Sequence, residues 1–543
     1  MNPRMLFKNK TWVPVIVFLA GIVALFPLLR YYVDDADTFS YISIAIKYSE
    51  GNFASAINST WSPLISVILS LLLHTHADVF LLFKLLQVLL GLSALLLSLR
   101  LIQLIRIEPA FGLILSLVLV PSFWAFSLLD LSADLLFLNL LLLIHVMLLK
   151  FNGINRKYAV LIGILGGMLY LAKAYGIFFF PLLCLFGYAL IYIQDKDKRK
   201  AILKNVAVSM TAYILISAAW ITAMSQKYQR FTVTDAPAYN SLLEKNMHVD
   251  SAKAHLQLMN RLVDPVPQHL NFAWEDPTLF IPEITANSTL TYSERKVIFK
   301  KNVLVYYYFL FRRQIGWLFI AAIIIGLLFQ KRNLGRREFV LLAFTAIVFP
   351  FGYFFLHLIA RYIFIITILM AVLTAYISSS LWKSERKALS FLLFLPLCIL
   401  LVKRPAKQLV WTKDEDKTSQ ELLYAFTHLP DAFHHTYDRD KAIFIVKDSL
   451  LHRNDLNGTM ANYPSVDTTA KNTLLLRHYL KNIYYGQIND ERIRESGIEV
   501  LQKEGVDFYY VWNNNIVNDS LVKSMKLMFE DNRSGLRIFR MKN

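Results

Sequence analysis

Long apolar runs, separated by short polar and basic segments, dominate the first 400 residues of the chain. An α-helix needs about 20 mainly apolar residues to cross the hydrocarbon core of a bilayer, and each run comes close to that length. The pattern therefore predicts an α-helical polytopic membrane protein with about eleven transmembrane helices. The runs lie at residues 11–30, 79–104, 111–129, 132–149, 158–172, 176–194, 203–224, 316–330, 338–357, 359–381 and 388–402.

The pattern changes after residue 402, where short strand-like and helix-like segments alternate. Such alternation is typical of a small α/β domain. We therefore divide the chain into a transmembrane module at 1–402 and an α/β domain at 403–543. The expected strands are Ala442–Lys447, Val506–Trp512 and Leu536–Met541, and the expected helices are Leu474–Tyr485 and Leu521–Phe529.

Basic residues gather in the short loops, and their distribution predicts the topology. The positive-inside rule places these loops and the N-terminus in the cytoplasm. The run at Pro63–Leu73 is too short to cross, so we expect it along the outer interface. Eleven crossings then leave the loops 31–78 and 225–315 outside, together with 403–543. The basic loops are Arg100–Arg106, Lys150–Lys157, Lys196–Lys204, Lys331–Arg337 and Lys383–Lys387.

Composition agrees with a membrane protein. Of the 543 residues, 56% are hydrophobic and 18% are charged, whereas soluble domains have about a quarter charged residues. The net charge of +18 does not indicate a nucleic-acid partner, because its basic residues sit in short loops between apolar runs. Cys184 and Cys398 lie in apolar runs and form no metal spacing. The first run lacks a small-residue cleavage site, so we expect an uncleaved helix.

Three carboxylates, Asp34, Asp35 and Asp37, follow the first run within four positions. A helical-looking apolar stretch that includes Tyr41 comes next. Charges beside lipid are costly, so a cluster of them invites a functional hypothesis. One of these carboxylates would act as a general base at the membrane surface. The alternative is structural, because an Asp at this place can cap the following helix.

Further charges fall at the predicted outer ends of later helices. Asp134 lies at an outer turn, where it is either an N-cap or part of a site. Lys173 and Arg361 are cations on the side that the positive-inside rule disfavours. Each alone can snorkel to head groups, but together with carboxylates they favour a site for an anionic lipid head such as a phosphate. Lys84, inside an apolar run, either reaches this site or snorkels.

The order and sidedness of these motifs resemble the GT-C superfamily of polytopic glycosyltransferases, in particular its protein mannosyltransferase and aminoarabinose transferase branch. The resemblance covers most of residues 1–402. The first outer loop of that branch carries an Asp-Glu-x-x-Tyr-like pattern, matched here by Asp37-Thr38-Phe39-Ser40-Tyr41 and followed by Trp61-Ser62-Pro63-Leu64. Thr38 replaces the family's Glu, which leaves Asp34 or Asp35 to supply a second acid. Asp134, Lys173 and the Arg361-Tyr362 pair match later family positions.

The resemblance implies transfer of a sugar from a polyprenyl-phosphate donor to an acceptor hydroxyl, with inversion at the anomeric carbon. It implies catalytic roles for Asp37, Asp35 and Asp134. It assigns the donor phosphate to Lys173, Arg361 and Tyr362, and the donor or acceptor pocket to Tyr41, Asp34 and Trp61. It implies no cofactor. The sequence shows no convincing metal site, although a divalent ion bridging Asp34, Asp35 or Asp134 stays open, and His74 and His76 fit an interfacial role better.

Other readings of the chain are a transporter or flippase, a ligase or polymerase of lipid-linked glycans, and a membrane protein that only presents its C-terminal domain. A transporter favours broken helices in repeated halves, and the sequence shows no internal repeat. The acceptor is a protein, a lipid or a glycan, and membrane lipids surround the module. We expect a bacterial inner membrane, with the site and the C-terminal domain on the extracytoplasmic side.

Overall fold

The computed structural model describes residues 12–29, 37–75, 77–241, 275–280, 291–312 and 315–427, and five strands of the C-terminal region. These residues belong to two compact units. The first unit comprises the described parts of Met1–Arg30, Ile57–Ser241 and Thr289–Thr412. The second comprises the described parts of Tyr31–Ala56, Leu242–Ser288 and Lys413–Asn543. Asp34, Asp35 and His76 lie outside the described residues.

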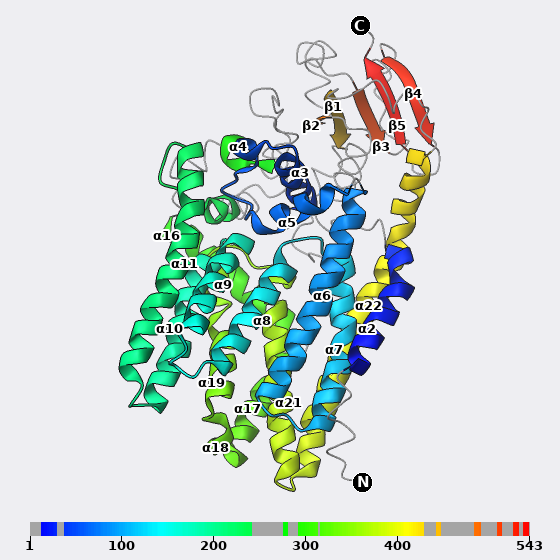
Figure 1. Ribbon diagram of the computed structural model, residues 1–543. Helices are drawn as coiled ribbons and strands as arrows, with labels where there is room; N and C mark the ends of the chain where they lie inside the picture. The colour runs from blue at the N-terminus through cyan, green and yellow to red at the C-terminus, as the bar shows by residue number, and fades with distance from the viewer. Residues whose placement is uncertain are drawn as a thin grey trace. The chain divides into compact units, whose positions relative to one another are not determined.

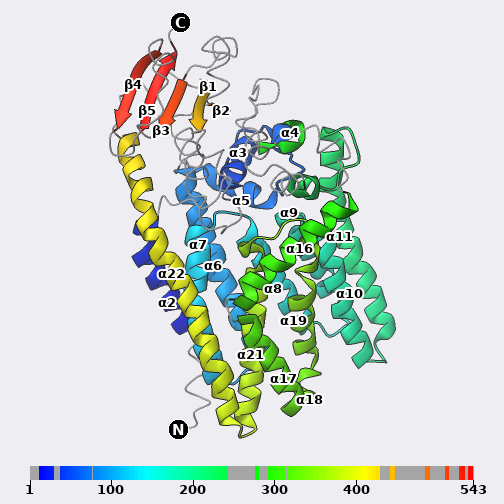
Figure 2. The same cartoon turned by 180° about the vertical axis from the view of Figure 1, so that it is seen from behind.

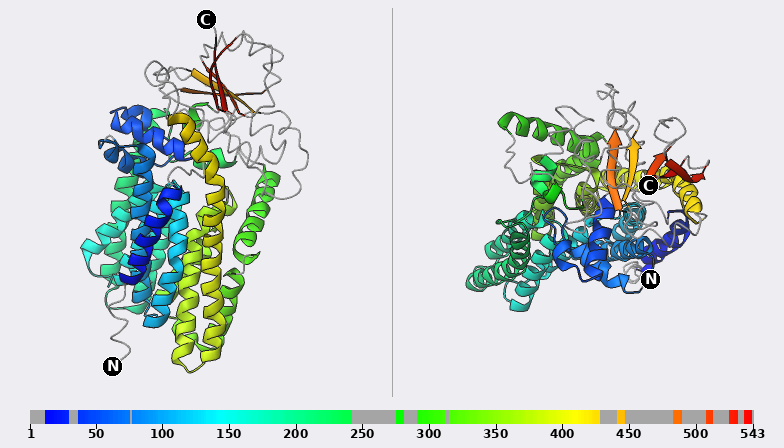
Figure 3. Two further views of the ribbon diagram at one scale, coloured as in Figure 1. Left: turned by 90° about the vertical axis from the view of Figure 1, so that its right-hand side faces the viewer. Right: turned by 90° about the horizontal axis from the view of Figure 1, so that it is seen from above.

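The first unit is a helix bundle whose long helices run side by side (Figure 1). Its helices alternate in direction, so the basic loops come together at one end of the bundle (Figures 1 and 3). The helices are α2 (Trp12–Leu29), α5 (Leu64–Leu73), α6 (Val79–Leu104), α7 (Pro109–Leu129), α8 (Asp134–Lys150), α9 (Arg156–Ala172), α10 (Gly176–Gln194), α11 (Arg199–Lys227), α16 (Tyr292–Tyr307), the π-helical turn η2 (Tyr308–Arg312), α17 (Ile315–Phe329), α18 (Lys331–Leu334), α19 (Arg337–Val348), α20 (Phe351–Phe354), the 3-10 turn η3 (Ala360–Ile363), α21 (Phe364–Lys383) and α22 (Lys387–Thr427), which extends past the unit.

Every apolar run of the sequence coincides with a helix, which confirms the polytopic helical fold class. Among the described residues, seven helices are long and apolar enough to cross a membrane, and the bent pair formed by α16–η2 and α17 makes an eighth. The helices α2, α8 and α9 contain 18, 17 and 17 residues. Such helices are about 25–27 Å long, so flanking residues must help them to bridge the hydrocarbon core.

Polar residues in the loops fix where several of these helices begin. The Asp78 side chain accepts a hydrogen bond from the Leu81 amide at 2.9 Å and caps α6. Glu108 caps α7 by accepting from Ala110 at 2.9 Å, directly before Pro109. These contacts satisfy amide groups that a helix start leaves without partners. These two acidic residues, which lie between apolar runs, thus set where α6 and α7 begin.

Close approach of α9 and α11 depends on a glycine and a serine. A Cβ atom on Gly163 would lie 2.2 Å from the Ser209 carbonyl oxygen, so only glycine fits there. The Ser209 hydroxyl donates to the Ala159 carbonyl at 2.7 Å and contacts the Tyr188 hydroxyl at 2.6 Å. In an apolar solvent, such polar contacts and small residues hold helices together. Figure 2 shows the bundle from behind, where α16, α21 and α22 lie towards the viewer.

The second unit contains helix α3 (Asp37–Ser49), the short helices α4 (Phe53–Ala56) and α14 (Pro277–Phe280), and a five-stranded sheet. The strands are β1 (Lys441–Val446), β2 (Ile483–Asn489), β3 (Phe508–Trp512), β4 (Met525–Asp531) and β5 (Leu536–Met541). Their order is β2-β1-β3-β5-β4. The pairs β1–β2 and β1–β3 are parallel, and the pairs β3–β5 and β4–β5 are antiparallel.

The sheet confirms the three expected strands and corrects the expected helices. The segment Leu521–Phe529 was predicted as a helix, but from Met525 onward it forms β4. The antiparallel ladder from Met525–Met541 to Asp531–Leu536 supplies backbone partners that a helix would not give, and such pairing overrides a weak local preference. The predicted helix Leu474–Tyr485 ends inside strand β2, and its residues before 483 lie outside the described chain.

Candidate functional site

Three of the predicted site residues meet in the first unit, although they are distant in sequence. Asp134 is the first residue of α8, Lys173 follows the last residue of α9, and Arg361 lies in the turn η3 before α21. The start of α8 and the end of α9 lie at the end of the bundle opposite the loop between α21 and α22 (Figure 1), and the contacts below place Arg361 with them. The alternation of helix direction brings these three termini together, as the sequence pattern predicted.

The carboxylate of Asp134 bridges the two cations. Its Oδ1 atom forms an ion pair with the Lys173 ammonium, and its Oδ2 atom lies 3.2 Å from Nε of Arg361. The Ser132 hydroxyl donates to the same Oδ2 atom at 3.1 Å. Arg361 also reaches Asp130, with 3.9 Å between Nη1 and Oδ1. Both oxygens of Asp134 thus have cationic partners.

An aromatic stack borders this cluster. The Lys173 ammonium lies 3.5 Å from the ring centroid of Tyr362, within the range of a cation–π contact. The Tyr362 ring stacks on Tyr353 with 4.9 Å between centroids, and Tyr353 stacks on Tyr175 with 4.2 Å. The Tyr175 hydroxyl donates to the Phe349 carbonyl at 2.5 Å. The stack therefore orients Tyr362, which in turn faces the cation.

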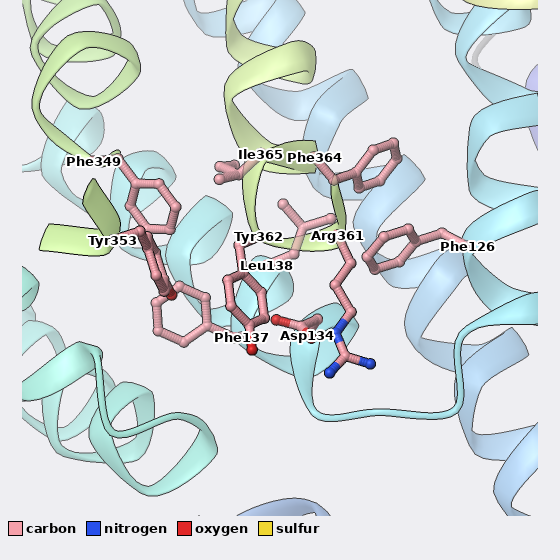
Figure 4. Close-up of a pocket in the computed structure, with 10 residues that line it drawn as sticks. All are labelled: Phe126, Asp134, Phe137, Leu138, Phe349, Tyr353, Arg361, Tyr362, Phe364 and Ile365. Atoms are coloured by element: carbon pink, nitrogen blue, oxygen red, sulfur yellow. Dashed lines mark ion pairs between the residues drawn. The ribbon is translucent and has the colours of Figure 1, made fainter. Parts of the chain in front are cut away.

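The cluster is partly open to solvent. The side chains of Asp134, Lys173 and Arg361 are 9%, 18% and 14% exposed. Burial lowers the pKa of the Lys173 ammonium, and the Asp134 carboxylate opposes that shift. Asp134, Arg361 and Tyr362 line a narrow pocket with aromatic and aliphatic side chains (Figure 4). Its free volume of about 10 Å³ is close to the space that one water needs.

Two polar residues of α6 support the turn that carries the acids. The Lys84 ammonium is buried and donates to the Leu128 carbonyl at 2.6 Å, and the Gln87 amide donates to the Ser132 carbonyl at 2.6 Å. The sequence left two options for Lys84, which were to reach the site or to snorkel to the membrane surface. The buried ammonium and its bond to Leu128 exclude snorkelling. The Lys84 ammonium is held two residues before Asp130 in the chain, at the end of α7.

The other predicted residues occupy different places. Asp37 begins α3, and Tyr41 lies one turn later and is buried. Both belong to the second unit, and their catalytic and binding roles stay predictions. Trp61 belongs to the first unit, where its backbone amide donates to Asn58 Oδ1 at 2.9 Å. Asp34 and Asp35, which were predicted for the pocket and for catalysis, lie outside the described residues.

No group of three or more His, Cys, Asp or Glu side chains suited to a metal ion occurs among the described residues. Asp34, Asp35 and His76 lie outside that part of the chain. A divalent ion that involves Asp34 or Asp35 therefore stays an open prediction.

Comparison with known proteins places the fold. No protein-family model matches the chain, and no curated protein does. Solved structures of an oligosaccharyltransferase from Archaeoglobus fulgidus match it, including two that contain a peptide. One is AglB in complex with an inhibitory peptide and a dolichol-phosphate, with 12% identity, a TM-score of 0.52, and coverage of 93% of this chain and 70% of that one. The other is tethered to an acceptor peptide, with 11% identity, a TM-score of 0.50, and coverage of 93% and 69%.

ArnT from Cupriavidus metallidurans bound to undecaprenyl phosphate matches more loosely, with 13% identity, a TM-score of 0.45 and coverage of 98% of both chains. At such low identities the AglB likeness defines the fold class and not the activity. The chain is an integral membrane protein with the fold of the polytopic GT-C proteins, as the motif resemblance led us to expect.

Proposed function

We propose that this protein is a glycosyltransferase that moves a sugar from a polyprenyl-phosphate-linked donor to an acceptor hydroxyl. The observation that carries the proposal is the meeting of Lys173 and Arg361 on Asp134, at the bundle end opposite the basic loops. An apolar lipid tail requires a catalyst within the membrane, and its phosphate requires cations at the membrane surface. A structure of AglB, which has this fold, contains a dolichol-phosphate.

In this proposal Lys173 and Arg361 bind the donor phosphate. An ammonium has three N–H donors and a guanidinium has five; Lys173 donates to Asp134, and Arg361 forms ion pairs with Asp134 and Asp130. The same cations can therefore also contact phosphate oxygens. Asp134 acts as a positioning residue that holds the two cations at a fixed separation. The Tyr362 ring also contacts the Lys173 ammonium and limits its movement. Such preorganised charge stabilises a leaving phosphate in the transition state.

The proposed reaction is a single displacement. The Asp37 carboxylate accepts the proton of the acceptor hydroxyl, and the acceptor oxygen attacks the anomeric carbon. The bond between that carbon and the phosphate oxygen breaks, and its electron pair leaves with the polyprenyl phosphate. Lys173 and Arg361 stabilise the charge that develops there. Attack opposite to the leaving group inverts the anomeric configuration, and one carboxylate base suffices.

We further propose that the site and the C-terminal domain face the extracytoplasmic side of a bacterial inner membrane. The position of the basic loops at the other end of the bundle supports this orientation. The acceptor hydroxyl belongs to a lipid, a glycan or a protein.

The test compares the wild type with Asp37→Asn in nanodiscs, using a panel of polyprenyl-phosphate sugars. Asn keeps the shape of Asp and can still cap a helix, but it cannot accept the proton. We expect the wild type to transfer or hydrolyse one donor, and Asp37→Asn to lose at least about a hundredfold in kcat while it binds polyprenyl phosphate normally.

Asp195→Asn is the matched control, because it makes the same chemical change in the exposed turn before α11. It should keep full activity. A fully active Asp37→Asn would move the base to Asp35, Asp34 or Asp134. A wild-type protein that turns over no donor and does not bind polyprenyl phosphate would overturn the proposed function.

A further inference from the structure

The second unit contains a buried ion pair that the proposed reaction does not use. Lys47 lies in the last turn of α3, and Glu275 lies 228 positions later, two residues before the start of α14. The Lys47 ammonium donates to Glu275 Oε1. The two side chains are only 4% and 1% exposed. The pair therefore joins the predicted first outer loop, 31–78, to the predicted second outer loop, 225–315, inside one compact unit.

A buried ion pair is a poor way to gain stability, because desolvation of both charges offsets much of their attraction. Its effect on geometry is stronger. Apolar side chains can slide past one another at a small cost, but separated charges in an apolar interior are strongly unfavourable. The contact between Lys47 and Glu275 therefore opposes movements that would separate the two segments.

The helix transmits that constraint to Asp37. Asp37 and Lys47 are the first and the eleventh residues of α3, so they lie about 15 Å apart along a rigid helix. The end of α3 is also well fixed. The Asn52 amide donates to the Lys47 carbonyl at 2.9 Å, and Gly51 closes the turn with a φ of +79°, which favours glycine. A shift at Lys47 therefore moves the whole of α3, including Asp37.

We propose that Lys47 and Glu275 are a positioning pair, by which the second outer loop sets the place of the helix that carries the catalytic base. The inference rests on the proposed function. It assigns to Glu275 a role in catalysis without contact with substrate. A displacement of about 1 Å of a reacting group can cost a hundredfold in rate. Loss of the Lys47–Glu275 contact should therefore lower kcat, because it lets α3 and Asp37 shift.

The test uses Glu275→Gln, which keeps the shape of the side chain and removes its charge. We expect kcat to fall by about tenfold to a hundredfold. The donor KM and the affinity for polyprenyl phosphate should stay within about twofold, because Lys173 and Arg361 belong to the other unit. The exchanged pair Lys47→Glu with Glu275→Lys should recover kcat to within about threefold of the wild type, since it restores the attraction.

Asp195→Asn is again the control, because the Asp195–Lys198 pair is exposed, and it should leave kcat unchanged. Wild-type kcat in Glu275→Gln, together with an inactive Asp37→Asn, would overturn this inference and leave the proposed function intact. An active Asp37→Asn would instead remove the base that the pair is proposed to position. A joint loss of kcat and polyprenyl-phosphate affinity, or no recovery in the exchanged pair, would make the pair a general structural element and also contradict the inference.

Discussion

The Asp134 cluster of the first unit and the Lys47–Glu275 pair of the second unit hold charge in different ways. Asp134 shares its two oxygens among Lys173, Arg361 and Ser132, and solvent reaches the cluster. Lys47 and Glu275 are buried and come from two distant segments. Cations with several partners and access to solvent can exchange a contact for a ligand. A buried pair cannot do so without leaving a charge desolvated. The first arrangement suits binding, and the second suits fixed geometry.

The largest effect should come from breaking the buried pair on one side only. Lys47→Met leaves Glu275 as an uncompensated buried charge, which should cost about 3–5 kcal/mol of stability. The double variant Lys47→Met with Glu275→Leu removes both charges and should lose much less. The thermal unfolding midpoint in nanodiscs measures both variants. If the single variant is as stable as the double variant, then Glu275 is not held as a buried anion.

A smaller effect is expected from the cations of the Asp134 cluster. Lys173→Gln and Arg361→Gln should each weaken polyprenyl-phosphate binding by about a hundredfold, which corresponds to about 2.7 kcal/mol. Their losses should not add in the double variant, because both cations contact Asp134. Titration of each fluorescently labelled variant with polyprenyl phosphate measures its dissociation constant. Lys198→Gln, which makes the same change in an exposed ion pair, is the matched control. Unchanged affinity in both single variants would move the phosphate site elsewhere.

The aromatic stack beside the cluster offers a third test. The buried amide of Asn302 donates to the carbonyls of Tyr353 and Phe354 at 3.2 and 3.1 Å, where the chain turns after α19. Asn302→Leu leaves these carbonyls without that donor and should cost about 1–3 kcal/mol of stability. Because Tyr353 stacks on Tyr362, donor affinity should fall too, by less than tenfold. A loss of stability without any change in affinity would show that the stack does not orient Tyr362.

The sequence predicted the bundle well because lipid imposes a simple rule on it. Apolar length alone located each helix, and the positive-inside rule put Asp134, Lys173 and Arg361 at one end. The three helix termini then meet as a consequence of alternating direction. The sequence could not predict the geometry of the contacts, because the pairing of Arg361 with Asp130 depends on the shape of η3. The signal that indicated this cluster was the presence of cations on the side that the positive-inside rule disfavours.

Other features had no such signal. Lys84 was noticed inside an apolar run, but its hydrogen bond to Leu128 depends on the packing of α6 against α7. Glu275 lies in a polar stretch where an acid is ordinary, and only the tertiary contact with Lys47 distinguishes it. Strand β4 reads locally as a helix, and its ladder with β5 decides otherwise. In each case a partner distant in sequence or in space determines the outcome, which local patterns do not encode.

The smallest effect should come from the exposed pair of Asp195 and Lys198, whose side chains are 30% and 37% exposed. Like the buried pair it joins a lysine to a carboxylate, but water already solvates both charges and salt screens them. The hydrogen bond from Lys198 lowers the pKa of Asp195. The contribution of this pair to the free energy of unfolding is therefore present above the ordinary pKa of Asp. It is lost as the pH falls through the lowered pKa of Asp195. Lys198→Gln should leave the unfolding midpoint unchanged at neutral pH. A clear loss of stability would mean that burial does not separate the two kinds of ion pair, and the contrast between the Asp134 cluster and the Lys47–Glu275 pair would need another basis.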